Sequence, residues 1–499
     1  MGVLLVLLLV SLLVPETEQW DISQMWNDLK EKITSIFSSS NSTLSEEENA
    51  FLEELNNTDS SQENFRHKLK ELRKFWLNKL NATTVDKEKK FSRKVRHHIR
   101  HTGDNLHEVN EKLNVAGNYY QGDIVLVPSQ MDSLVTTEEK RAKRQAYKDR
   151  FYPRTIWPNN MVYYYFDNSL SQKARNVIAL AIRFWQQNTC ISFSQSSSAS
   201  NRIRFFPGQG CYSNVGKIGG QQDISIGQGC ESVGTAAHEI GHALGFFHEQ
   251  SRYDRDSYIN VLVQNIQPGW VDQFDKETPS TNDNYNMRYD YGSVMHYAGT
   301  SASRNGNPTM QARDAQYQDT MGSDIVSFRD VNEMNMHYSC KARCQNYNTP
   351  CQNGGFPHPR DCTKCLCPAG YGGDYCNQRP QGCGATLTAT STPKTLTANV
   401  GDGVSSEKDQ FVYCNWRIQA DPGKRIQVRI TSYQTRQCTL GCVYGGIELK
   451  AQADQTMTGY RYCCGSDVGE TVTSVGNVLP LIAFNRYNAE RFSIQYVAV

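Results

Sequence analysis

One segment of the chain, 238–248, has residues that could bind a metal ion, and it reads His-Glu-Ile-Gly-His-Ala-Leu-Gly-Phe-Phe-His. On a helix, His238 and His242 share one face because they are four residues apart. Gly245 can take the left-handed conformation that ends a helix, so the chain can turn and bring back His248 as a third ligand. Three protein ligands plus water are typical of a catalytic zinc, whereas a structural zinc has four protein ligands. The spacing therefore predicts a catalytic zinc site.

Glu239 lies beside the first of these histidines and could do acid–base chemistry. Its carboxylate is placed to hold the water on the metal and to take a proton from it as general base. The alternative is an amphipathic helix with surface histidines. In that interpretation Gly245 has no role, whereas the zinc site needs it to end the helix. We therefore expect zinc to be held by His238, His242 and His248.

The zinc helix requires elements that hold it in place, and the sequence around it predicts them. Segment 161–166 is rich in β-forming residues, and 172–188 has helical periodicity. Segments 191–193 and 203–206 are predicted to be short strands, and 330–338 a final helix. A β–α–β–β order ahead of the zinc helix predicts a mixed α/β N-terminal half for this domain.

Residues downstream of the zinc segment indicate a family. Glu249 follows the third histidine and begins the run Glu-Gln-Ser-Arg-Tyr-Asp-Arg-Asp, and residues 293–297 read Ser-Val-Met-His-Tyr. With the extended histidine pattern, these residues resemble the astacins, a branch of the metzincin metalloproteases. The resemblance implies a Met-turn in which Met295 forms an apolar floor under the zinc ligands. It also implies that the hydroxyl of Tyr297 helps to stabilise the oxyanion.

The segment 16–144 is polar, charged and free of cysteine, and we expect it to be a propeptide. Its residues 120–123 read Tyr-Gln-Gly-Asp and resemble the astacin propeptide motif of an aromatic residue, any residue, glycine and aspartate. The resemblance implies that Asp123 binds the zinc and displaces the catalytic water. An anionic oxygen ligand would close the open coordination position. A cysteine-based latch is excluded because this segment has no cysteine.

The predicted propeptide ends in a basic run, Arg-Ala-Lys-Arg, whose last residue is Arg144. Furin-like convertases cut at this spacing, and a charged surface turn is the alternative. The position directly before the protease-like sequence favours cleavage between Arg144 and Gln145. In the astacins the new N-terminus is buried near the glutamate that follows the third histidine. The resemblance therefore implies that Gln145 comes to lie near Glu249.

The cysteines predict disulfide-bonded units. The chain has 16 of them, and none precedes Cys190. An even number in separate groups suggests an oxidising compartment. The astacin resemblance implies the pairs Cys190–Cys340 and Cys211–Cys230.

Two further resemblances cover the C-terminal part of the chain. Residues 344–376 end in a Cys-x-Cys-x8-Cys pattern and resemble an EGF-like module. Residues 383–499 contain Cys-Asn-Trp-Arg-Ile and Cys-Val-Tyr-Gly-Gly-Ile-Glu and resemble a CUB domain. The implied disulfides are Cys344–Cys362, Cys351–Cys365, Cys367–Cys376 and Cys383–Cys414. An additional bridge is expected among four cysteines whose pairing stays open: Cys438, Cys442, Cys463 and Cys464.

The N-terminal third suggests export. Residues 2–14 are almost wholly apolar, too short to span a bilayer and suited to the core of a signal peptide. No later stretch is apolar and long enough to span a membrane. Sequons at Asn41, Asn56 and Asn81 fit an exposed secreted segment. Histidines at 97, 98, 101 and 107 alternate with Arg and Lys, which predicts a solvated basic helix and no second metal site.

We therefore expect a multidomain, secreted, extracellular chain. The predicted parts are a signal peptide (1–15), the propeptide (16–144), an α+β metzincin-type protease domain with a mixed sheet (145–340), an EGF-like module (341–380) and an all-β CUB sandwich (383–499). The net charge of +1 gives no electrostatic case for a nucleic-acid partner. The CUB domain is expected to dock substrate or matrix proteins.

The predicted function is that of a zinc-dependent metalloendopeptidase, made as a zymogen with one zinc ion per subunit. Its substrates would be extracellular proteins of matrix, cuticle, eggshell or host tissue, and hatching, moulting, digestion and invasion all stay open as roles. One alternative is a catalytically dead scaffold that binds through its EGF-like and CUB modules, but Glu239 and the three histidines are complete. Another is a different metzincin branch such as the adamalysins, against which Glu249 and the absent cysteine latch argue.

Overall fold

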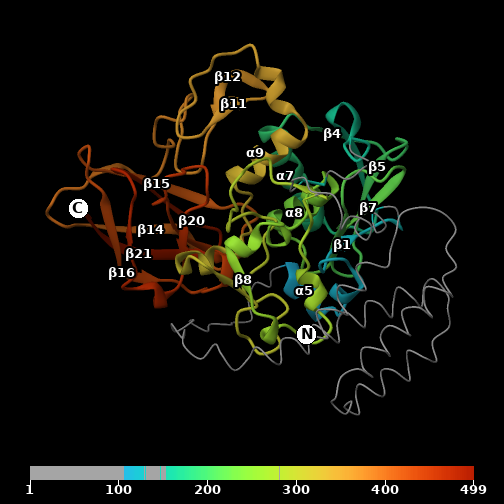
Figure 1. The fold of residues 1–499 in the computed structure, drawn as a ribbon, viewed down its shortest axis with the longest axis horizontal. Helices are drawn as coiled ribbons and strands as arrows, with labels where there is room; N and C mark the ends of the chain where they lie inside the picture. The colour runs from blue at the N-terminus through green and yellow to red at the C-terminus, as the bar shows by residue number, and fades with distance from the viewer. Residues whose placement is uncertain (1–105, 129, 131–145, 148–152, 280) are drawn as a thin grey trace, which may run out of the picture. The chain divides into compact units, whose positions relative to one another are not determined.

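A computed structural model describes residues 106–128, 130, 146–147, 153–279 and 281–499 (Figure 1). All of them belong to one structural unit, Arg96–Val499. Several predicted features lie outside the described residues. These are the signal peptide, the sequons at Asn41, Asn56 and Asn81, the histidines at 97, 98 and 101, and the cleavage site at Arg144 and Gln145.

A six-stranded mixed sheet forms the scaffold around the zinc segment, with the strand order β1-β6-β7-β5-β3-β4. Four strands run parallel to one another, and β6 runs antiparallel to β7 at one edge. The strand β1 comes from the predicted propeptide and pairs in parallel with β6. The strands are β1 (Ile124–Val125), β3 (Met161–Phe166), β4 (Ser192–Gln195), β5 (Arg202–Phe206), β6 (Cys211–Asn214) and β7 (Gln221–Ile226). The expected mixed α/β fold is therefore confirmed, with a strand of the predicted propeptide at its edge.

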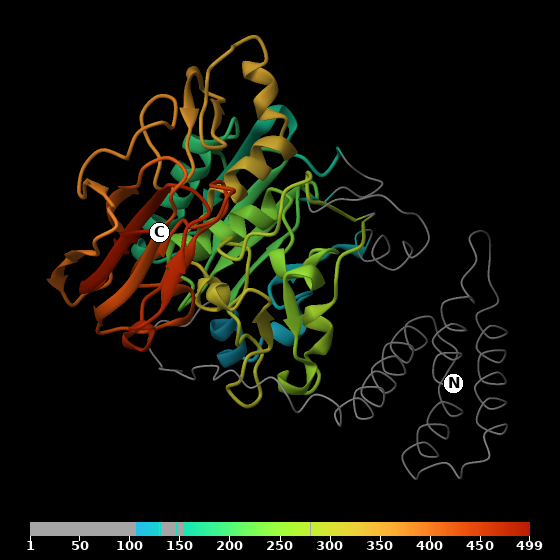
Figure 2. The same ribbon diagram turned by 60° about the vertical axis from the view of Figure 1, so that its left-hand side comes forward.

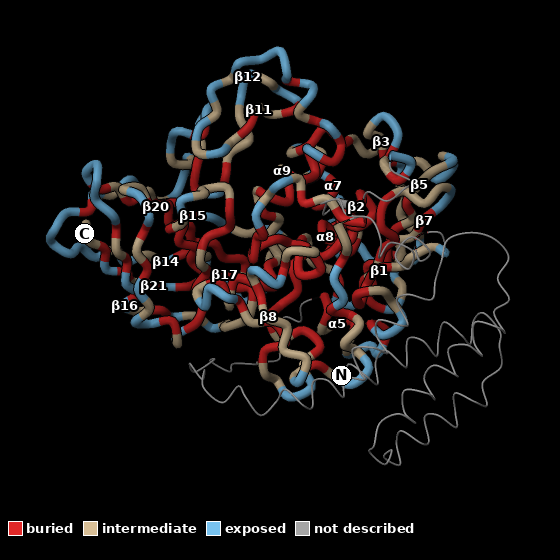
Figure 3. Tube along the Cα trace, in the orientation of Figure 1, coloured by how far each residue is buried: buried red, intermediate tan, exposed pale blue. Residues whose placement is uncertain are grey.

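Two helices pack on each other beside this sheet, α7 (Gln172–Asn188) and α8 (Val233–Ala243). The indole of Trp185 on α7 donates a hydrogen bond to the carbonyl of Ala237 on α8 at 3.1 Å. A second buried indole, of Trp157, donates to the carbonyl of Ala243 at 2.9 Å. All residues of α8 after its first are buried, as Figure 3 shows for this part of the trace. The zinc helix is thus fixed in the core, where a shift of its axis would break both indole contacts.

The end of α8 follows the expected break in the helix. Gly245 has a φ of 113°, and a Cβ there would lie 2.7 Å from Nε2 of His337. Any side chain at this position would therefore meet both backbone strain and a steric conflict. The glycine lets the chain leave the helix and return toward it with His248.

The final helix, α9 (Phe328–His337), starts two residues earlier than the predicted 330–338. Ser327 and Asp330 form a capping box, in which each side chain accepts from the other residue's backbone N–H. Asp330 also accepts hydrogen bonds from the hydroxyl of Ser293 at 2.5 Å and from the backbone N–H of Val294 at 2.9 Å. One carboxylate therefore starts the last helix and holds the chain just before Met295.

The C-terminal part is a β-sandwich, with a five-stranded sheet of order β13-β15-β20-β17-β18 and a four-stranded sheet of order β14-β21-β16-β19. Apolar residues from both sheets form one buried cluster between them. The strands are β13 (Thr386–Thr388), β14 (Lys394–Val404), β15 (Val412–Gln419), β16 (Ile426–Gln434), β17 (Gly445–Leu449), β18 (Tyr460–Tyr462), β19 (Thr471–Thr473), β20 (Val478–Asn485) and β21 (Asn488–Ala498). The expected all-β sandwich is confirmed.

Short elements complete the described fold. The helix α5 (Leu106–Lys112) lies in the predicted propeptide, and the hairpin β11–β12 lies in the predicted EGF-like module. The remaining strands form two further pairs, β2 with β9 and β8 with β10. Their bounds are β2 (Ala146–Tyr147), β8 (Ile259–Val261), β9 (Asn282–Asp283), β10 (Met310–Ala312), β11 (Phe356–His358) and β12 (Asp361–Leu366). The EGF-like identity of residues 341–380 stays a prediction.

The structure contains disulfides at all the pairs that the resemblances imply. They are Cys190–Cys340, Cys211–Cys230, Cys344–Cys362, Cys351–Cys365, Cys367–Cys376 and Cys383–Cys414. The four cysteines left open form two bridges, Cys438–Cys464 and Cys442–Cys463. Both crosslink the same two loops of the sandwich.

The sandwich contacts the predicted protease part directly (Figure 2). Arg486 forms an ion pair with Asp324 at 2.5 Å. The hydroxyl of Thr458 donates to the carboxylate of Asp290 at 3.1 Å, and a Cβ on Gly292 would lie only 2.3 Å from the Thr458 side chain. Asp290 and Gly292 directly precede the predicted Met-turn. The sandwich therefore packs beside the segment that carries Met295.

Replacing Gly245 by alanine is expected to destabilise the precursor by about 1–3 kcal/mol, because alanine must adopt an unfavourable backbone conformation. Urea unfolding of the purified chain measures this change. Gly476→Ala is the matched control, since that glycine has ordinary backbone angles and open space around it. Equal stability of the two variants would contradict the role given to Gly245.

Candidate metal centre and active site

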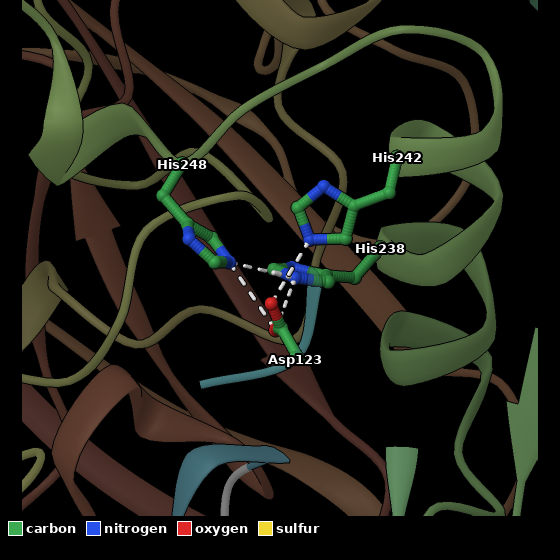
Figure 4. Close-up of side chains that lie close together, drawn as sticks. All are labelled: Asp123, His238, His242 and His248. Carbon is green, nitrogen blue, oxygen red and sulfur yellow. Dashed lines mark hydrogen bonds and ion pairs between the residues drawn. The ribbon is translucent and has the colours of Figure 1, made fainter. Parts of the chain in front are cut away.

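Three histidine side chains and one carboxylate converge in the core of the protease part. His238 and His242 come from α8, His248 from the chain after Gly245, and Asp123 from the turn before β1 (Figure 4). The carboxylate Oδ2 of Asp123 lies 3.2 Å from Nε2 of His238 and 3.2 Å from Nε2 of His248. Its Oδ1 lies 3.4 Å from Nε2 of His242. The four ligand atoms lie within 4.8 Å of one another, and all four residues are buried.

Each histidine ring is oriented by an acceptor at its other nitrogen. Nδ1 of His238 donates to the carbonyl of Val294 at 2.8 Å, and Nδ1 of His242 donates to the carbonyl of Phe246 at 2.7 Å. Because a carbonyl can only accept, these Nδ1 atoms carry the proton and the Nε2 lone pairs face the cluster. Two of the three rings are thereby held in the tautomer that binds a metal.

The third ring has an acceptor from the predicted propeptide. Oε1 of Gln121 lies 3.0 Å from Nδ1 of His248. The amide nitrogen of Gln121 donates elsewhere, to Glu277, so the ring nitrogen of His248 is the donor in this contact. Burial lowers the pKa of His242 and brings the pKa of His248 to about 3, which favours the neutral form that ligates metals. Three neutral imidazoles and a carboxylate oxygen fit a zinc ion.

Glu239 is buried next to this cluster and has an unusual environment. Neither of its carboxylate oxygens has a hydrogen-bond partner among the residues that the structure describes. Burial, and then the negative charge of Asp123, raise the pKa of Glu239 well above its usual value. Burying a carboxyl group without hydrogen-bond partners destabilises the folded protein. Its position beside the metal ligands therefore indicates a chemical role.

The segment with Asp123 is held in place by backbone pairing. Tyr120 and Ile124 exchange two backbone hydrogen bonds around a tight turn, and the carbonyl of Asp123 accepts from the N–H of Ser213 in β6 at 3.0 Å. Gln121 and Gly122 in this turn have φ values of 51° and 92°. The turn directs the Asp123 side chain into the histidine cluster. The neighbouring histidines hold the pKa of Asp123 well below its usual range despite its burial, so it is a carboxylate.

Tyr297 and Met295, the residues of the predicted Met-turn, both lie beside the histidine cluster. The hydroxyl of Tyr297 lies 2.8 Å from Oδ2 of Asp123 and 2.7 Å from the carbonyl of Gln121, and it can donate to either. Met295 is buried, and its sulfur would lie 2.9 Å from a Cβ built on Gly241 of α8. The methionine therefore packs directly on the helix turn between the first two histidine ligands.

Glu249 is buried one residue after the third ligand. Its Oε1 accepts hydrogen bonds from Nη1 of Arg252 at 3.1 Å and from the backbone N–H of Asp290 at 2.7 Å. Burial raises the pKa of Glu249 to about 7, although the charge of Arg252 opposes this shift. Since Gln145 lies outside the described residues, the predicted contact between Gln145 and Glu249 stays a prediction.

His107 corrects one expectation. The sequence predicted a solvated helix for the histidines up to this position, but His107 is buried on α5 with its ring 4.7 Å from that of Tyr297 and 5.6 Å from that of Trp270. Its Nδ1 lies 3.2 Å from Oε1 of Glu111. The apolar Leu106 and Val109 at helical spacing were the available signal that one face of this helix is buried.

Comparisons with known proteins agree with this geometry. A family model described as Astacin, a peptidase family, matches residues 149–339. The zinc metalloproteinase nas-31 of Caenorhabditis elegans is 45% identical over 504 residues, which cover 96% of this chain and 81% of that protein. The chain belongs to the astacin family. Like its relatives, this astacin is a metallopeptidase whose cofactor is zinc.

Further matches extend the comparison. The zinc metalloproteinase nas-32 of Caenorhabditis elegans is 40% identical over 398 residues, which cover 78% of this astacin and 60% of that protein. A CUB domain model matches residues 383–496. Among solved structures, the high choriolytic enzyme 1 of Oryzias latipes, a hatching enzyme zinc-protease, is 31% identical, with a TM-score of 0.36. That match covers 39% of this chain and 98% of the hatching enzyme.

Replacing Gln121 by leucine is expected to weaken zinc binding by the precursor about tenfold, because His248 loses the acceptor that orients its ring. Competition with a fluorescent zinc chelator measures the affinity. Tyr120→Phe is the matched control, since it also removes one hydrogen bond to Glu277 but leaves His248 untouched. Equal zinc affinities of the two variants would show that Gln121 does not support the metal site.

Proposed function

We propose that this chain is the precursor of a secreted zinc endopeptidase, with Glu239 as the general base and Asp123 as the group that keeps the site closed. The observation that carries the proposal is the position of Asp123 among the three buried histidines, beside the buried Glu239. When held by His238, His242 and His248, zinc supplies a Lewis acid that polarises a peptide carbonyl and acidifies water.

The protein side chains have separate roles in this proposal. Glu239 takes a proton from the attacking water and returns it to the leaving amine. Tyr297 donates its hydroxyl hydrogen to the oxyanion that forms on the substrate. The Met295 side chain keeps α8 and the first two ligands at a fixed distance from the Met-turn.

The same contacts explain why the precursor would be inactive. Asp123 occupies the space between the three Nε2 atoms, and with the Gln121 carbonyl it also engages the hydroxyl of Tyr297. Both the open ligand position and the oxyanion donor are thus unavailable to a substrate. We propose that a furin-like convertase cuts between Arg144 and Gln145. Release of the propeptide, including β1, would then free both groups.

The proposed mature chain starts at a point that the fold holds in place. Strand β2, which begins one residue after Gln145, pairs with β9. This pairing supports a fixed position for the new N-terminus near the protease core. A contact between its ammonium group and Glu249 would add to the charge compensation that Arg252 supplies.

Secretion and extracellular protein substrates are part of the same proposal. All cysteines among the described residues are paired in disulfides, which fits an oxidising compartment. In the described part of the chain, no helix has the length and apolar character needed to cross a bilayer. Matrix, cuticle, eggshell or host-tissue proteins are the proposed substrates, with the signal peptide and glycans at Asn41, Asn56 and Asn81 as expected features of export.

We further propose that the CUB domain takes part in substrate selection. A cavity of about 300 Å³ beside His238 and Tyr297 is lined by Tyr444 and Arg486 of the CUB domain and by His107 of the propeptide. Loss of the propeptide would open this cavity further. A protein substrate that reaches the metal centre from this side would contact the CUB domain as well as the protease domain.

A dead scaffold is the second candidate, and Glu239 distinguishes it from an enzyme. Glu239→Gln is expected to keep zinc bound while casein cleavage falls by at least about 100-fold, because the general base is lost. Zinc content is measured by atomic absorption, and the wild type treated with a zinc chelator provides the metal-free reference. Casein cleavage by Glu239→Gln at the wild-type rate would contradict the proposed mechanism.

The closing role of Asp123 is tested in a precursor that cannot be cut. The double variant Asp123→Ala with Arg144→Ala is expected to cleave a small peptide substrate without processing, because the carboxylate no longer fills the space between the three Nε2 atoms. The matched control is Arg144→Ala alone, which should stay inactive. Equal inactivity of both uncut variants, with zinc bound in each, would show that Asp123 is not what keeps the site closed.

A further inference from the structure

Glu277 is a buried carboxylate of the protease domain that binds the propeptide through two side chains. Its Oε1 accepts hydrogen bonds from the hydroxyl of Tyr120 at 2.7 Å and from the amide of Gln121 at 3.0 Å. Its Oε2 accepts from the hydroxyl of Thr281 at 2.8 Å. The backbone N–H of Glu277 donates to the carbonyl of Ser251, which fixes the residue to the chain that follows His248.

Release of the propeptide changes the surroundings of this carboxylate. Both donors to Oε1 belong to the propeptide, so of these three side-chain contacts only the one with Thr281 is left in the mature enzyme. A carboxylate left in a recess destabilises the folded protein unless other donors or water replace the lost hydrogen bonds. Burial raises the pKa of Glu277 to about 7 in the precursor, which reflects the depth of the recess. The vacated position can accept a hydrogen bond from another chain.

The recess is close to the place where a substrate is cut. Tyr120 is three residues from Asp123, and three residues of extended chain span at most about 10 Å. Since Asp123 lies among the metal ligands, a substrate residue within about three positions of the cleaved bond can reach Glu277. The ring of Tyr120 also makes an edge contact with Phe247, at a centroid distance of 6.4 Å. The recess therefore offers an aromatic wall and an acceptor at its end.

We propose that Glu277 forms a substrate subsite that selects a long side chain ending in a hydrogen-bond donor, with the Tyr120 phenol as its occupant in the precursor. Tyrosine and glutamine are neutral side chains of this kind, and lysine and arginine are the cationic ones. A cation gains most from a carboxylate, because charge-assisted hydrogen bonds are the stronger ones. The proposal rests on the proposed function, since it requires an enzyme that has lost its propeptide.

Peptide substrates that differ by one donor test the subsite. The activated full-length enzyme is assayed on peptide pairs that carry tyrosine or phenylalanine, or lysine or norleucine, at each position within three residues of the cleaved bond. The wild type is expected to prefer tyrosine over phenylalanine by about tenfold in kcat/KM at one of these positions, as a hydrogen bond to a charged group predicts. Lysine should be preferred over norleucine at the same position.

Three variants assign these preferences to Glu277. Glu277→Leu is expected to abolish both preferences, whereas the isosteric Glu277→Gln should keep the preference for tyrosine and lose the preference for lysine. Asp275→Asn is the matched control, because it removes an exposed neighbouring carboxylate and should leave both preferences unchanged. If Glu277→Leu does not fold, the loss of the lysine preference in Glu277→Gln still tests the subsite.

The outcomes separate this proposal from the proposed function. Casein cleavage by the wild type together with equal rates for every peptide pair would overturn the subsite and leave the peptidase function in place. Preferences that persist in Glu277→Gln and Glu277→Leu would also overturn it, and would assign Glu277 to holding the propeptide alone. Cleavage of neither casein nor any peptide by the zinc-loaded wild type would overturn the proposed function, and the subsite with it.

Discussion

The structure depends on one electrostatic arrangement, a buried carboxylate surrounded by three buried imidazoles. Moving a charge into the protein interior is costly unless a cation or hydrogen bonds compensate for it. Here the compensation for Asp123 would come from a zinc ion bound by the three imidazoles, together with the hydroxyl of Tyr297. The surrounding architecture can be understood as what holds these groups together: the indole contacts of α8, the turn at Gly245 and the strand pairing that fixes Asp123.

The predicted propeptide makes several different contacts at this centre. Within four residues it supplies a carboxylate to the metal position, an acceptor to His248 and donors to Glu277. In the proposed mature enzyme, the metal position, His248 and Glu277 would each have a different partner. The turn that makes this arrangement possible requires positive φ at two consecutive residues, Gln121 and Gly122. In the proposed precursor, inhibition and the orientation of the third ligand would thus come from the same short segment.

Local sequence patterns were sufficient to predict the parts of the site that lie on a single helix, turn or strand. The spacing of His238 and His242, the break at Gly245 and the strand at 161–166 follow from helix and strand geometry, and the structure has them at those positions. The contacts of Glu277 with Gln121 and of His107 with Tyr297 could not be found in this way. Each joins residues more than 100 positions apart, so that only the folded chain brings them together.

Other features could not be predicted from the sequence, for different reasons. Gln121 occupies a motif position at which any residue is allowed, so the pattern carries no information about its contact with His248. Four cysteines admit three pairings, and sequence spacing does not choose among them. The start of α9 at Phe328 depends on the capping box of Ser327 with Asp330, a local signal that the periodicity of apolar residues does not report.

The most direct measurement of the central claim is a crystal structure of the zinc-loaded precursor, with the metal located by anomalous scattering. The account predicts a zinc ion bound by Nε2 of His238, His242 and His248, with a carboxylate oxygen of Asp123 as the fourth ligand at about 2.0–2.2 Å. A precursor whose zinc carries water in the fourth position, with Asp123 outside ligand distance, would contradict it.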